Sequence, residues 1–434
     1  NTLESNKEDD GKGLSESLWN DDRYIQLWEY QGSFDNSLNP VHPAMEANRS
    51  TWQLWASWSY YATSSMYTAA LGPTQTRTKV FGTYDPPEWT DITVDTNGVR
   101  RIVYLQNYYN GGNTWGYLNV WQSGGQNANV EHLGDDTAAA PAYSDGMDEQ
   151  LYQFQNPRIA YDPVNNRNYV SYYDAYSLTL KYAITQGNTQ TFVADVGHRI
   201  DGAIVVDGIE DTTAPPTTTG ADVGLWSSIA VDSYGGTDAT TVRPVIMYYD
   251  TTNSTLKIAR GNSSQPNGTA EWTISNVFKD DDPNRTDVGY YVTMKMDSSG
   301  NIHAVAYRIS TGDLIYLYAP NVDGTGSYTF NYSEIVDSNG AVGSWCDIDL
   351  VGTTPYISYL TAGGIGTFQG LKFAYKTGGN WEYGVVATNS IVKDGRTSVV
   401  ARPTSAAWVN ATQGKVAIAY VSGNFDLVIL EDEK

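Results

Sequence analysis

Four aromatic residues occupy one equivalent position in a repeated sequence phrase, six residues before the place of a closing aspartate, where one phrase has Val351 instead. They are Trp89, Trp226, Tyr291 and Trp345. Aromatic side chains offer large apolar faces with a polar edge, so a set of them around one opening would suit the apolar faces of sugar rings. Large flat side chains also fill wedge-shaped gaps between repeated units, and this structural use is the alternative. Asn156 and Thr404 are expected at the same place in two further units.

Two arginines lie beside proline at predicted first-strand positions, Arg158 and Arg402. A guanidinium donates in a fixed fork, so arginines that converge on one site can clamp a carboxylate. The alternative is pairing with acidic neighbours, because the chain holds 49 Asp and Glu against 26 Lys and Arg. The predicted ligand-binding set is therefore these two arginines with the four aromatic residues.

An acidic segment carries the candidate metal ligands, Asp280, Asp282 and Asp287. Carboxylate oxygens are the ligands that calcium prefers, although the segment lacks the spacing and central glycine of an EF-hand loop. A solvated loop is the alternative. The four histidines are scattered and predict no zinc site, so calcium is the one cofactor that the sequence suggests.

An aspartate closes four of the phrases and precedes a turn. These residues are Asp95, Asp162, Asp232 and Asp297. Aspartate in that place commonly accepts hydrogen bonds from the amides of the turn. No second carboxylate or histidine stands at a spacing that would make any of them catalytic, so their predicted role is structural.

The charge of the chain limits its partners. The 434 residues carry a formal net charge of −23. Nucleic acids and anionic membranes attract clustered cations, so neither is expected to bind. The chain contains no run of about 18 apolar residues, and we expect no membrane span. The expected partner is a glycan or an extracellular protein, bound by a monomer.

The phrases belong to a repeat with several short β-runs in each unit. Val223–Asp232 recurs as Val288–Asp297 and, more loosely, as Val342–Leu350, at intervals of about 55 to 65 residues. Two further β-runs follow each phrase. Such a repeat is typical of an all-β propeller whose first strands line a central channel.

Counting the units predicts seven four-stranded blades, with six or eight as alternatives. The final unit, expected to start at Pro403–Val409, has only three runs, and an N-terminal strand, Tyr24–Tyr30, would complete it. Two long insertions are expected at Ser123–Gln150 and Asp201–Gly220. We predict a single propeller domain over residues 18–434, after a disordered tether over residues 1–17.

Composition suggests an exported protein. The one cysteine, Cys346, excludes an intrachain disulfide and is expected to be a small buried residue. Few cations and a polar N-terminal stretch suit a secreted protein, or a bacterial lipoprotein held at the cell surface by a lipid anchor.

Two motifs of the repeat carry a family resemblance. Tyr-rich second strands such as Ile246–Asp250 are followed by a Leu-Lys-x-Ala element at Leu180, Leu256 and Leu371. Together they resemble the blades of sialidase-like, Asp-box-related β-propellers of secreted bacterial proteins, over roughly residues 44–430. The resemblance implies the fold. The start motif and Asp-box turns of the enzymes are missing, so it implies no catalytic residue.

The functional expectation is a secreted or surface-anchored binding protein without enzymatic activity, which recognises a glycan or a protein through a propeller face or the central channel. The alternative is a glycoside hydrolase or lyase that uses channel carboxylates. A structural component of an envelope assembly is a third interpretation, because fold alone does not decide among them.

Overall fold

A computed structural model gives the fold. It describes residues 23–26, 43–60, 65–70, 77–82, 87–110, 113–124, 127–132, 154–175, 177–186, 204–208, 220–232, 241–278, 287–321, 328–330, 332–361, 370–387, 397–403, 414–421 and 427–433. Within these ranges the structure is all-β, with one short 3-10 turn, η4 (Thr269–Glu271).

The strands form seven four-stranded antiparallel sheets. The first four blades, from the innermost strand outward, are β2 (Ala44–Ala47), β3 (Leu54–Tyr60), β4 (Ser65–Ala70), β5 (Arg77–Gly82); β6 (Pro87–Val94), β7 (Arg100–Asn110), β8 (Asn113–Gln122), β9 (Asn127–His132); β10 (Phe154–Asp162), β11 (Arg167–Asp174), β12 (Thr179–Gln186), β13 (Ile204–Asp207); and β14 (Val223–Asp232), β15 (Arg243–Asp250), β16 (Thr255–Gly261), β17 (Trp272–Asn276). The last three are β18 (Val288–Met296), β19 (Ile302–Arg308), β20 (Asp313–Ala319), β21 (Tyr332–Asp337); β22 (Val342–Val351), β23 (Thr354–Thr361), β24 (Leu371–Thr377), β25 (Asn380–Ala387); and β26 (Ser398–Pro403), β27 (Gly414–Val421), β28 (Leu427–Glu433), β1 (Arg23–Gln26).

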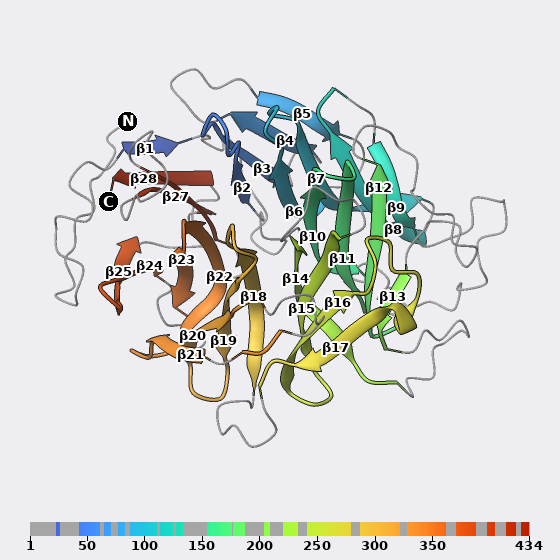
Figure 1. The fold of residues 1–434 in the computed structure, drawn as a ribbon. Coiled ribbons are helices and arrows are strands. Elements are labelled where there is room, and N and C mark those ends of the chain that lie inside the picture. Colours follow the sequence, from blue (N-terminus) through green and yellow to red (C-terminus); the bar gives the residue numbers. More distant parts are fainter. Residues whose placement is uncertain are drawn as a thin grey trace.

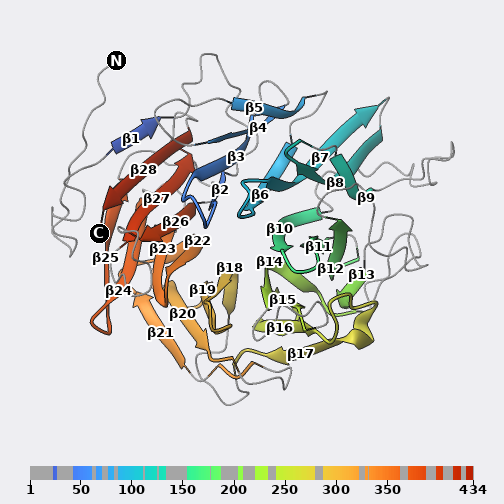
Figure 2. The same cartoon turned by 45° about the horizontal axis from the view of Figure 1, so that its top comes forward.

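The sheets stand around a common axis, and Figures 1 and 2 show them arranged in a ring. The innermost strands contact one another in the closed order β2, β6, β10, β14, β18, β22, β26 and back to β2. The predicted β-propeller with seven blades is therefore confirmed, and equivalent positions of the inner strands share one environment.

The ring closes as the sequence predicts. β1 pairs antiparallel with β28, from Arg23 opposite Glu431 to Gln26 opposite Val428. An N-terminal strand thus completes the last blade as its outer strand (Figure 2). This pairing covers the edge of β28 and joins the N-terminal part of the chain to its C-terminal blade.

Three sequence predictions about the strands are wrong. Both predicted insertions contain the fourth strand of a blade, β9 in one and β13 in the other. The final unit begins with β26, before Pro403 rather than at it. Pro403 ends that strand because proline has no N–H to donate to the ladder.

The Val-Gly start of the phrase serves blade packing. Gly224 has φ +112°, and a Cβ there would lie 2.6 Å from the Cα of Leu180 in the preceding blade. Gly343 stands in the same relation to Leu314, with 3.1 Å to its Cα. Only glycine permits this approach and backbone conformation together, so the Val-Gly motif fits against the leucine of the third strand of the blade before it.

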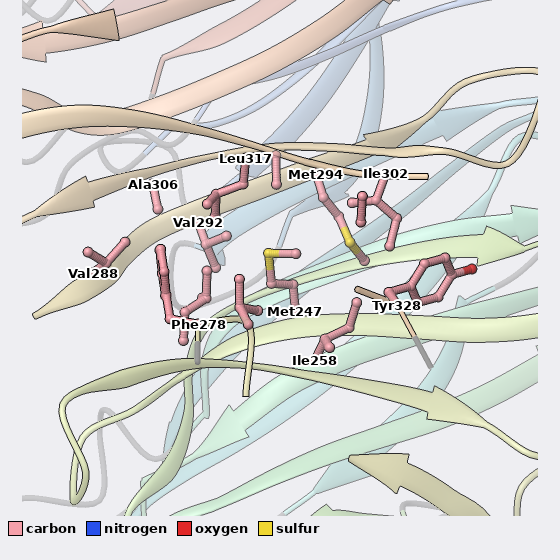
Figure 3. Close-up of a cluster of buried hydrophobic side chains, with 14 of the residues drawn as sticks. Met247, Ile258, Phe278, Val288, Val292, Met294, Ile302, Ala306, Leu317 and Tyr328 are labelled. Atoms are coloured by element: carbon pink, nitrogen blue, oxygen red, sulfur yellow. The ribbon is translucent and has the colours of Figure 1, made fainter. Parts of the chain in front are cut away.

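Apolar side chains fill the space between neighbouring blades. Figure 3 shows one cluster, in which Met247 and Ile258 of one blade face Val292, Met294 and Leu317 of the next. All of them are almost fully buried. Each blade therefore depends on the next for its core, as expected for a repeat architecture.

The turn aspartates behave as predicted where the turn is described. Asp95 accepts the amides of Asn97 and Val99, and Asp297 accepts those of Ser299 and Asn301. Asp162 also accepts two turn amides. The turn after Asp232 lies outside the described residues, and among the described ones this carboxylate accepts from Arg260 and Tyr328.

Two further predictions concern burial and membranes. Cys346 is buried and unpaired, as predicted. No helix among the described residues has the length and apolar character needed to cross a bilayer. The predicted tether over residues 1–17 lies outside the described residues.

Candidate functional site

The four predicted aromatic residues meet at the propeller axis. The ring centroids of Trp226 and Tyr291 lie 4.3 Å apart, and Trp345 is 4.6 Å from Tyr291 and 5.1 Å from Trp226. Trp89 lies 5.6 Å from Trp345, although their blades are not neighbours. The rings therefore cross the axis and pack on one another, which a wedge between adjacent blades would not do.

Each of these residues has a left-handed backbone. Trp89, Trp226, Tyr291 and Trp345 have φ between 50° and 56°, and Asn156, at the same position of its blade, has φ 54°. The strand register shifts at this point in all five blades. A bulge of this kind redirects a side chain, and here it aims the side chain at the axis. A non-glycine residue in the left-handed conformation costs about 1–2 kcal/mol, and five inner strands each contain one at this position.

The aromatic rings form the floor of a small open hollow. Trp345 is 9% exposed, and the other three rings are partly exposed. The hollow is lined by Trp89, Asn156, Pro157, Arg158, Trp226, Ser227, Tyr291, Val292, Trp345 and Cys346. Five of the six predicted ligand-binding residues thus lie together, and the structure does not test whether they bind anything.

Two hydrogen-bond donors at the hollow have no acceptor among the described residues. Asn156 is 5% exposed, and its Nδ2 finds no partner. The indole Nε1 of Trp226 is likewise buried without a partner. Leaving such a donor unmet costs about 1–3 kcal/mol. Trp58 and Trp272, in the cores between blades, also bury indole donors without a partner, so the two donors of the hollow are distinguished by their position at the axis. Ser227, in contrast, shares a hydrogen bond of 3.0 Å with Ser171.

Arg158 is held at the hollow by an acidic neighbour. Its Nη1 lies 3.7 Å from Oδ1 of Asp91, and its side chain is 16% exposed. The pairing that the sequence offered as an alternative is therefore present. Arg402 lies near the end of β26, and its side chain is outside what the structure describes.

Below the aromatic rings, polar side chains tie one inner strand to the next. Asp347 accepts the amide of Val399 at 3.0 Å and the hydroxyl of Ser398 at 3.1 Å. Asp91 accepts the amide of Ile159 at 3.1 Å. These residues stand two places after the aromatic position in their strands, so this layer of the channel holds neighbouring blades together.

A second charged layer follows two residues further along the strands. Glu46 pairs with Lys295 at 2.9 Å and with Arg49 at 2.7 Å. Arg49 also binds both oxygens of Asp349, at 2.8 and 3.0 Å. Lys295 and Arg49 are each 36% exposed, so water reaches this end of the channel. The sequence analysis missed this network, although Lys295, Asp347 and Asp349 stand inside the repeated phrase.

The channel carboxylates differ in their readiness to hold a proton. Burial raises the pKa of Asp347 to about 6, although the positive charges of Arg158 and Lys295 act to lower it. Burial also raises the pKa of Asp91. Glu46 has a pKa lowered to about 2, because the charges of Arg49 and Lys295 outweigh its desolvation. Two carboxylates whose pKa values are pushed apart in this way are the kind of pair that acid–base chemistry uses.

The charged residue that reaches the hollow is a cation, because Arg158 lines it and the channel carboxylates do not. The arrangement can therefore bind a ligand by stacking and by donated hydrogen bonds. No carboxylate of the described residues is among those that line the hollow.

The structure describes one of the three predicted calcium ligands. Asp280 and Asp282 lie outside the described residues, and Asp287 forms part of a turn, where its amide donates to Ser254. No group of three or more metal-ligating side chains occurs in the described ranges. The prediction of calcium remains untested. Thr404, expected beside Asn156, also lies outside the described residues.

Comparisons with known proteins find no sequence relative and only distant structural similarity. No protein-family profile and no curated protein sequence matches the chain. Among solved structures, an α-L-arabinanase from Penicillium chrysogenum complexed with arabinobiose is 12% identical, with a TM-score of 0.44 over 94% of this chain and 96% of that one. An α-L-arabinofuranosidase from Fusarium graminearum in complex with an iminosugar inhibitor is 9% identical, with a TM-score of 0.46 over the same shares.

The WD40 β-propeller domain of Doa1 is as similar, at 9% identity and a TM-score of 0.43 over 91% of this chain and 93% of that one. Identities and scores this low carry no argument about activity. The propeller itself is established by its seven sheets, and the likeness to sialidase-like blades stays a prediction.

Proposed function

We propose that this protein binds a glycan in the hollow above the aromatic rings. The observation that carries the proposal is the convergence of Trp89, Trp226 and Tyr291, each partly exposed, on a hollow beside unmet donors. Partly exposed aromatic faces suit sugar rings, and donors without acceptors suit their oxygens.

The left-handed backbones support the same proposal. A residue in that conformation persists only where its surroundings hold it there, and such residues gather at ligand sites. Asn156 and Trp226 line the hollow, and each has a donor without an acceptor among the described residues. A secreted or surface-anchored protein meets glycans outside the cell, and the composition of the chain suits that location.

A glycan array followed by calorimetry tests the proposal. The wild type should bind at least one saccharide, and W226A should weaken that binding by about tenfold or more, because a stacking face and a donor are lost together. W226F keeps most of the ring packing and should fall between the two. Circular dichroism of each variant confirms that it is folded.

Tyr375 offers a matched control. It is a partly exposed aromatic residue on β24 whose hydroxyl donates to Glu382, away from the hollow. Y375A should bind as the wild type does. Equal loss in W226A and Y375A would point to general destabilisation. No glycan binding together with a stable protein partner in pull-downs would favour an assembly role.

Hydrolysis is the second candidate, and one observation favours it. Asp347, with its pKa raised to about 6, and Glu46, with its pKa lowered to about 2, could act as acid and base. An assay for released reducing ends, on whichever glycan binds, separates the two. The binding proposal predicts no turnover. Turnover that D347N abolishes would establish the enzyme instead.

A further inference from the structure

We propose that the hollow receives the acetamido group of a neutral, N-acetylated sugar. This inference rests on the proposed function and names the ligand class for the same site. Three features of the hollow carry it: unmet donors, an apolar lining beside them, and a cation whose charge is already balanced.

Among the described residues that line the hollow, the two buried polar atoms without a hydrogen-bond partner are both donors. Asn156 Nδ2 and Trp226 Nε1 have no acceptor among the described residues. A group that satisfies them must bring an acceptor oxygen, as a carbonyl does. A protonated amine brings only donors, so an ammonium group in the place of the acetamido group could not accept from either nitrogen.

The lining beside the donors is apolar. Pro157, Val292 and Cys346 border the hollow, but all three are buried, so the apolar surface that a ligand can reach belongs mainly to the aromatic rings. A plain hydroxyl gains little from such a surface. The acetamido group presents a carbonyl on one side and a methyl group on the other, and so matches both parts of the lining.

Charge favours a neutral ligand. Arg158 is the cation that lines the hollow. It pairs with Asp91, and its charge also attracts the carboxylate of Asp347. A ligand carboxylate would compete with these two acids for one guanidinium. The whole chain also repels anions, with a formal net charge of −23.

Calorimetry with small methyl glycosides tests the inference. The probes are those of N-acetylglucosamine and N-acetylgalactosamine, compared with those of glucose and galactose, glucosamine and glucuronic acid. The better N-acetylated probe should bind at least about tenfold more tightly than its hydroxyl counterpart, since a carbonyl acceptor and a buried methyl group are gained together. The amine and the carboxylate should bind no better than the hydroxyl sugar.

Variants of Asn156 locate the effect. N156D keeps a side chain that tolerates a left-handed backbone but replaces the donor by an acceptor. N156G removes the side chain and also suits φ 54°. Both should bring the preference for the acetamido group down to about twofold or less.

Asn166 provides the control. It lies in the same blade with φ 52°, in the turn after β10, where it accepts from Tyr161. N166D makes the same chemical change away from the hollow, and the preference should survive it.

The outcomes separate this inference from the proposed function. Binding of plain hexosides at the hollow, lost in W226A but without an acetamido preference, would overturn the inference and keep the function. Tighter binding of the glucuronide would likewise overturn it in favour of an anionic ligand. Failure of every saccharide, on the array and in calorimetry, would overturn both.

Discussion

The rings of Trp226 and Tyr291 lie 4.3 Å apart at the propeller axis, although they come from neighbouring blades and both have left-handed backbones. The contact joins the two features that define the site. A bulge in each of these two inner strands aims its aromatic side chain at the axis. The packing of the rings offsets the cost of the left-handed backbones. The axis of this propeller is therefore closed by aromatic contacts at one end and lined by ion pairs toward the other.

Glycine at the aromatic position should be tolerated at least as well as alanine. W226A and W226G lose the same ring contacts, at a cost of about 2–4 kcal/mol in a partly exposed site. Alanine keeps the left-handed strain, about 1 kcal/mol, while glycine relieves it. Urea unfolding should thus rank W226G at or above W226A. A clear advantage for alanine, the usual order in strands, would contradict the strain argument.

The glycine of the Val-Gly motif should resist substitution more than an ordinary turn glycine. In G224A the new Cβ would stand 2.6 Å from the Cα of Leu180, so both backbone strain and a clash arise. We expect a loss of about 3 kcal/mol or more in unfolding free energy.

Gly268 supplies the comparison, since it has φ +100° with nothing within 4 Å of its Cβ position. G268A should cost only the strain, about 1–2 kcal/mol. Equal losses in G224A and G268A would show that the contact with the preceding blade is unimportant.

The stability of the wild type relative to D347N should rise as the pH falls from 7 to 4. The pKa of Asp347 is about 6 in the folded state, because of burial, and about 4 when unfolded. The folded protein therefore holds this proton more tightly. The resulting stabilisation is complete below about pH 4 and is lost as pH rises through 6.

Unfolding midpoints at several pH values test this. The wild type should gain stability relative to D347N by up to about 2–3 kcal/mol between pH 7 and pH 4. A difference that does not change with pH would mean that Asp347 ionises normally, which would also weaken its case as a general acid.

His303 should act in the opposite direction. Its Nδ1 lies 2.6 Å from the hydroxyl of Tyr316, and burial lowers its pKa. The unfolded chain then binds the proton more readily, with a pKa of about 6.5, so stability falls as pH drops below that value. H303Q should reduce this decline between pH 7 and pH 5. An unchanged decline would assign the acid sensitivity to other groups.

The sequence predicts the inner part of the propeller well and the outer part poorly. The repeated phrase identifies the inner strands of three blades and the shared place of Trp226 and Trp345, because both blade packing and the axis constrain those residues. Outer strands such as β9 and β13 are short and their sequences carry little alternating pattern, so the sequence predicts insertions in their place.

The candidate site divides in the same way. Local sequence indicates which residues could stack, and Arg158 reaches the hollow as proposed. Pairings such as Arg49 with Asp349, 300 residues apart, depend on closure of the ring and have no local signal. The one clue was a charge at Lys295 and at Asp347, inside strands expected to be buried. Charges at such places are seldom left unpaired.

The most direct test of the account is the indole N–H resonance of Trp226, assigned with W226F and followed by NMR as a glycan from the array is added. Its unmet donor should find an acceptor in the ligand, so the resonance should shift and saturate with binding. The indole of Trp381, which already donates to Glu334 at 2.6 Å, serves as the internal reference and should stay in place. Saturable binding of the glycan with the Trp226 resonance unmoved would contradict the account.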